Sequence, residues 1–128
     1  MRKSEINELI CKKFFELGVP ASLMGFKYLR EAIEMVLEDE SVLHKGITKH
    51  MYPTIARNNH TTPSRVERTM RHAVEVSFLR CDIDTLERNF GNCIKFENGK
   101  LTNSEFIACI AKVLRIEIQR AGEDNENV

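Results

Sequence analysis

The chain has 128 residues, the size of one domain, and its 42% apolar and 30% charged residues are typical of a globular protein. No apolar run is long enough to span a membrane, and the first residues do not resemble a secretory signal. Nineteen basic residues balance nineteen acidic ones, which excludes binding of nucleic acid through bulk positive charge but not through a local basic face.

Two helices are predicted in the first third of the chain. The first covers residues 4–17, where apolar residues recur every three or four positions, with Ser4 as its N-cap and Gly18 at its end. The second covers residues 25–38 and has the same spacing. Gly46 then interrupts the chain.

The middle of the chain contains two further helical segments. In the first, residues 48–58, Pro53 removes one backbone donor, which predicts a kink or a local 3₁₀ turn. Thr62 as N-cap and Pro63 at the first helical position then begin the clearest helix, which we expect to end near Leu79.

Two capping-box patterns indicate the C-terminal helices. Asp84 and Glu87 predict the start of a short helix, and Thr102 and Glu105 predict the start of the last one, which we expect to end near Arg120.

The remaining segments complete an all-α prediction. Turn residues in the segment 91–101 favour a small hairpin, and the acidic segment 122–128 is expected to be a disordered tail. Strands with alternating polarity are not evident. We therefore expect one cytoplasmic domain over residues 1–121, a compact bundle of about six helices.

The two middle segments have the outline of a helix-turn-helix, joined by a tight polar turn over residues 59–62. Projected at 100° per residue, the second helix has an apolar stripe for the core on one side. The opposite side and its flanks carry polar and charged residues: Ser64, Arg65, Glu67, Arg68, Arg71, His72 and Glu75. Arginine can bind guanine in the major groove and glutamate can accept from cytosine, so this face is a candidate for base recognition.

Charge is also segregated toward this region. Residues 44–80 contain seven Lys and Arg against two Glu, whereas the segments on either side are net acidic. Such a block is often only a solvated polar face. Together with the capped turn and the short preceding helix, it favours a helix-turn-helix.

Other chemistries have little support in the sequence. Cys11, Cys81, Cys93 and Cys109 form no CxxC pair and are expected to be reduced thiols. Neither the cysteines nor the histidines have the spacing of zinc ligands, and no phosphate-binding loop or dinucleotide fingerprint is present. We therefore predict no metal, no cofactor and no enzymatic activity.

The sequence closely resembles one known family over residues 6–118, nearly the whole chain. The matching motifs are Gly18-Val19-Pro20-Ala21, Tyr28-Leu29-Arg30-Glu31-Ala32-Ile33, Ile47-Thr48-Lys49, Tyr52-Pro53, Thr61-Thr62, Ser64-Arg65-Val66-Glu67-Arg68, Arg71-His72-Ala73, Asp82-Ile83-Asp84, Phe90-Gly91 and Thr102-Asn103-Ser104-Glu105-Phe106. The family is the C-terminal DNA-binding effector domain of the stage-zero sporulation protein A, the master response regulator of endospore formation.

The resemblance implies a six-helix domain that binds double-stranded DNA at a short element usually written TGTCGAA. The element often occurs in tandem copies, so the protein could bind as a dimer on two of them. By residue match, Arg65, Glu67 and Arg68 would contact bases. Side chains for the DNA backbone would be Ser64, Arg71 and His72. Thr48 and Lys49, at the start of the preceding helix, are added as phosphate contacts on geometry alone.

The family also contacts the housekeeping sigma factor of RNA polymerase through the region after the recognition helix. Here that region is 84–94, and Asp84, Glu87 and Phe90 are the candidate contacts, although the sequence departs from the family pattern at residues 87–89 and 92–93. The receiver domain of the family's regulators has no counterpart here. We expect the chain to be a stand-alone effector, and the alternative is an excised domain.

The alternative is a protein-interaction module that binds a sigma factor or a full-length regulator and no longer reads DNA. Such a module is expected to have lost one of the three base-contacting residues, and all three are present. DNA binding is therefore the preferred hypothesis.

Overall fold

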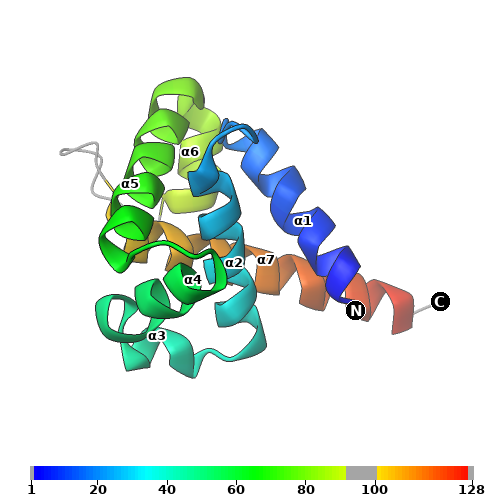
Figure 1. Cartoon of the computed structure of the whole chain (residues 1–128). Coiled ribbons are helices and arrows are strands. Elements are labelled where there is room, and N and C mark those ends of the chain that lie inside the picture. The colour runs from blue at the N-terminus through cyan, green and yellow to red at the C-terminus, as the bar shows by residue number, and fades with distance from the viewer. Residues whose placement is uncertain (1, 92–100, 127–128) are drawn as a thin grey trace.

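A computed structural model describes residues 2–91 and 101–126 of the chain (Figure 1). These residues form seven α-helices, one π-helical turn and no strand, which confirms the all-α class. The elements are α1 (Lys3–Glu16), α2 (Met24–Glu38), α3 (Ser41–Lys45), η1 (Ile47–Met51), α4 (Tyr52–Asn58), α5 (Pro63–Arg80), α6 (Ile83–Phe90) and α7 (Asn103–Glu126).

The end of α1 was predicted correctly and its beginning was not. Arg2 is the N-cap and makes no side-chain capping bond, so Ser4 lies inside the first turn. At the other end Gly18 has φ +72°, and the amide of Val19 donates to the carbonyl of Phe14 at 2.9 Å. This is a left-handed helix ending, which glycine adopts without strain.

The segment before α4 contains two features that periodicity did not predict. Asp39 accepts hydrogen bonds from the amide and hydroxyl of Ser41 at 3.0 and 2.7 Å, which organise the short helix α3 and lower the pKa of this carboxyl group. The distortion expected near Pro53 is a π turn, η1, and not a 3₁₀ turn. A widened turn is a known way to accommodate a proline that cannot donate to the helix ladder.

The capping prediction for α5 is confirmed, and the one for α6 is wrong by two residues. Thr62 Oγ1 accepts the amide of Arg65 at 3.2 Å. For α6 the cap is Asp82, which accepts the amide of Thr85 at 2.7 Å. That bond lowers the pKa of Asp82. Asp84 lies inside the helix. The prediction failed because the sequence contains two aspartates that could cap α6, and the spacing of Asp84 to Glu87 favoured the wrong one.

The start of α7 is confirmed and its end is not. Thr102 and Glu105 form a reciprocal capping box, each side chain accepting the other's amide at 3.1 Å. The helix continues to Glu126, so the predictions of an end near Arg120 and a disordered tail are wrong for residues 122–126. The hairpin predicted within residues 91–101 falls mainly on residues 92–100, outside the described part of the chain.

A row of phenylalanines connects five helices in the core. Phe14 of α1 contacts Phe26 of α2 with ring centroids 5.1 Å apart, and Phe106 of α7 at 6.1 Å. Phe106 in turn contacts Phe90 of α6 at 5.5 Å, and Phe90 contacts Phe78 of α5 at 5.6 Å. Aromatic side chains bury large apolar areas, so this row is a main source of cohesion between the helices.

The helix α5 is positioned by close contacts with the start of α2 and with the end of α1. Gly25 of α2 lies so near α5 that a Cβ atom there would be 2.5 Å from the carbonyl oxygen of Thr69. Ser77 is fully buried, and its hydroxyl donates to the carbonyl of Leu17 at 2.7 Å. In Figure 1, α2 lies centrally, with α1 on one side and α4 and α5 on the other.

The cysteines differ from the expectation of four reduced thiols. Cys11 and Cys81 are free, whereas Cys109 is disulfide-bonded. Spacing in a sequence does not show which cysteines the fold brings together, so this bond was not predictable. Among the described helices, none is both long and apolar enough to cross a membrane.

Candidate DNA-binding surface

Helices α4 and α5 form the predicted helix-turn-helix, and the turn between them is firmly anchored. The amide of Thr61 donates to the carbonyl of Ala56 at 3.0 Å. Asn59 Nδ2 donates to the carbonyl of Ile55 and to Glu31 Oε2 of α2, both at 2.8 Å. His60 has φ +53°, a left-handed conformation that closes the turn. The turn therefore fixes where α5 begins.

The two sides of α5 have the predicted division between core and solvent. The residues of the predicted apolar stripe are all buried: Val66, Met70, Ala73, Val74 and Ser77. The residues that project outward are Ser64, Arg65, Arg68, Arg71, His72 and Glu75. The exposed face begins at the first turn, which is the part of a recognition helix that reaches base edges.

The charged residues on this face differ in their partners. Arg65 and Arg68 form no ion pair with any described residue, so both guanidinium groups are available to a ligand. Glu67, by contrast, is only partly exposed and pairs with Arg71, one turn along α5, at 3.3 Å. A pair of this exposure contributes little to stability and is easily exchanged for another partner.

Thr48 and Lys49 lie on the π turn, just before the first helix of the motif, and both side chains are exposed. Gly46, with φ +99°, precedes this turn and redirects the chain into it. The structure thus leaves both side chains accessible, as a phosphate contact requires.

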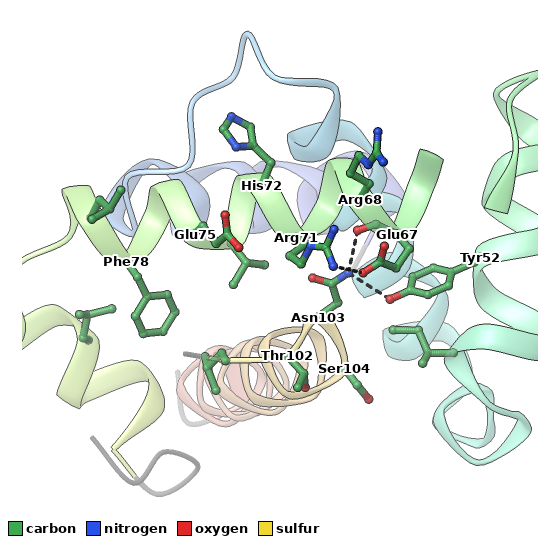
Figure 2. A pocket seen from close by; sticks show the side chains of 15 residues that line it. Tyr52, Glu67, Arg68, Arg71, His72, Glu75, Phe78, Thr102, Asn103 and Ser104 are labelled. Atoms are coloured by element: carbon green, nitrogen blue, oxygen red, sulfur yellow. Dashed lines mark hydrogen bonds and ion pairs between the residues drawn. The ribbon is translucent and has the colours of Figure 1, made fainter. Parts of the chain in front are cut away.

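A hollow runs between α5 and the start of α7, beside the exposed face (Figure 2). At one end, Asn103 Nδ2 donates to Tyr52 Oη at 3.0 Å and to the carbonyl oxygen of Glu67 at 3.1 Å. Burial of the Tyr52 phenol raises the pKa of this group above its ordinary value. Sequence reasoning gave neither Tyr52 nor Asn103 a role, because their proximity arises only when α4, α5 and α7 pack together.

The region after α5 does not present all three residues predicted to contact a sigma factor. Asp84 and Glu87 are exposed on α6. Phe90 is 0% exposed and lies within the phenylalanine row, so its prediction as a surface contact is wrong. In this chain Phe90 therefore serves packing. Residues 92–94, the rest of the predicted region, lie outside the described chain.

A helix-turn-helix whose second helix presents arginines from its first turns is typical of helix-turn-helix DNA-binding domains. The family model described as the sporulation initiation factor Spo0A C terminal matches residues 10–114. The chain belongs to this family. It is accordingly a DNA-binding effector domain of the sporulation type, and the family is one of transcription regulators and not of enzymes.

Proposed function

We propose that this protein is a sequence-specific regulator that reads a TGTCGAA-like element by placing α5 in the major groove. One observation carries the proposal: Arg65 and Arg68, on the exposed first turns of α5, form no ion pair with another residue in the described part of the chain. Arginine binds guanine O6 and N7 bidentately, and two guanines are present on the written strand of the element. In this proposal residues 1–121 form one effector domain.

The remaining contacts divide into base and backbone groups. Glu67 would accept a hydrogen bond from a cytosine amino group and give up its ion pair with Arg71. Arg71, released, would turn to a phosphate together with His72 and Ser64. Thr48 and Lys49 would bind phosphates of the DNA backbone, since both side chains project from η1, just before the first helix of the motif.

Replacing Arg68 with alanine is expected to weaken binding to the matched element by about 1–3 kcal/mol and to relax the preference at one base pair. The reason is the loss of one bidentate base contact, with no buried group of the protein disturbed. Titration of single-base variants of the element checks this. Undiminished affinity of Arg68→Ala for the matched duplex would show that Arg68 does not read a base.

Replacing Lys49 with alanine is expected to weaken matched and scrambled duplexes alike. The slope of log affinity against log salt should fall by about one, because one phosphate contact and its released counterion are lost. Binding measured across a salt series checks this. A loss confined to the matched duplex would contradict a backbone role.

Tandem elements give two copies of the protein a natural arrangement on DNA. If each copy occupies one element, the centres of the two sites should lie about 34–36 Å apart, one helical turn. Each copy would then face the same side of the duplex, where neighbouring subunits can touch.

A second function, binding to a sigma factor, is favoured by one specific observation. Leu79 and Ile83 are 86% and 69% exposed, and Asp84 and Glu87 lie on the same short helix as Ile83. Exposed apolar side chains together with exposed carboxylates fit a basic, partly apolar partner surface. If the double variant Asp84→Ala/Glu87→Ala kept full affinity for the sigma factor, this contact would be excluded; we expect affinity to fall while DNA binding is kept.

A further inference from the structure

We propose that Asn103 is a positioning residue that sets the placement of the recognition helix and thereby the sequence preference of the protein. This inference rests on the proposed function. Asn103 is the first residue of α7, only 7% exposed, and does not lie on the exposed face of α5. It acts through the backbone of α5.

The two bonds of Asn103 connect the two helices of the motif to a third. Its Nδ2 donates to Tyr52 Oη, on α4, and to the carbonyl oxygen of Glu67, on α5 (Figure 2). One amide group therefore fixes the position of α5 relative to both α4 and α7. The bond to α5 reaches the turn that carries Glu67 and Arg68, two of the three proposed base contacts.

The orientation of the amide follows from the chemistry of its partners. A carbonyl oxygen can only accept, so the nitrogen and not the oxygen of Asn103 must face Glu67. The oxygen, Oδ1, is then left buried with no hydrogen-bond partner among the described residues. An unpartnered buried acceptor is costly, so this position is not optimised for stability alone. We infer that it is optimised for the bond to α5.

Small displacements of α5 matter because base contacts are geometrically demanding. A bidentate contact needs both of its hydrogen bonds in line, whereas contacts to the continuous phosphate backbone tolerate a shift. Loss of the Asn103 bonds is therefore expected to reduce discrimination between sequences more than overall affinity.

The chain offers a matched control in Asn89, which is 6% exposed on α6 and donates to the carbonyl oxygen of Thr85 at 2.9 Å. Leucine has the same number and branching of side-chain heavy atoms as asparagine and can neither donate nor accept a hydrogen bond. Asn103→Leu and Asn89→Leu thus remove one buried amide each, and only the first touches the helix-turn-helix.

The experiment compares the parent chain with both variants by fluorescence anisotropy, using a TGTCGAA duplex and a scrambled duplex at one salt concentration. We expect Asn103→Leu to reduce the ratio of the two affinities about tenfold, comparable to losing one base contact, with scrambled-duplex affinity unchanged. Asn89→Leu should leave the ratio unchanged, even if its midpoint of thermal unfolding falls as far as that of Asn103→Leu.

An unchanged ratio in Asn103→Leu, with a parent that does prefer the matched duplex, would overturn the inference. A parent with no preference would instead contradict the proposed function itself, so the two failures are distinguishable. If Asn103→Leu does not fold, Asn103→Asp decides: it has the same size but no Nδ2 to donate to the carbonyl of Glu67, and we expect the ratio to fall about tenfold. An unchanged ratio in Asn103→Asp would then overturn the inference.

Discussion

Replacing Phe90 with alanine is expected to lower the free energy of unfolding by about 3–5 kcal/mol. The side chain is fully buried and its ring contacts Phe78 and Phe106, at centroid distances of 5.6 and 5.5 Å. Alanine would leave a cavity where α5, α6 and α7 meet. Chemical denaturation monitored by circular dichroism measures the loss.

The matched control for this substitution is Phe15→Ala. Phe15 is 63% exposed. It contacts the phenylalanine row only through Phe26, with ring centroids 5.9 Å apart. The same chemical change there should cost less than about 1 kcal/mol. A stable Phe90→Ala protein with impaired sigma-factor binding would contradict the core role that the structure gives this residue.

Replacing Gly25 with alanine is expected to destabilise the protein by about 1–3 kcal/mol, although alanine favours helices over glycine. The new Cβ would meet the carbonyl oxygen of Thr69 at 2.5 Å and the Cβ of Ala73 at 2.6 Å. Backbone cannot move aside as a flexible side chain can, so α2 and α5 must separate. DNA binding should therefore weaken together with stability, and both are measurable on the same protein.

Gly122 is the control, because a Cβ there would meet nothing within 4 Å. Gly122→Ala should be neutral or stabilise the protein by up to about 1 kcal/mol through helix propensity in α7. Gly25→Ala with unchanged stability and unchanged DNA affinity would show that the two helices are not held as closely as the structure indicates.

The sequence predicted those features of the fold that depend on local chemistry. The apolar stripe of α5, the Thr62 cap and the Thr102–Glu105 capping box are all determined within a few residues, and all are confirmed. The error at α6 occurs where two local solutions compete. Asp82 and Asp84 are both suitable caps for α6, and the correct choice depends on how the chain leaves α5.

The candidate site was predictable only in part for a related reason. Outward-facing residues of one helix, such as Arg65 and Arg68, follow from periodicity. The ion pair between Glu67 and Arg71 is an i,i+4 contact that spacing could also have suggested. Asn103 contacts a residue 36 positions away, and its role emerges only from tertiary packing. Phe90 shows the reverse case, because a motif residue that looked functional serves the core.

The most direct test of the central claim is fluorescence-anisotropy binding of the purified chain to duplexes with one or two TGTCGAA elements and to scrambled controls, at two salt concentrations. The proposed function predicts a preference of about a thousandfold or more for the matched duplex. Equal and strongly salt-sensitive binding to all duplexes would mean a basic face without base recognition. No binding at either salt would contradict the claim and favour the protein-interaction module.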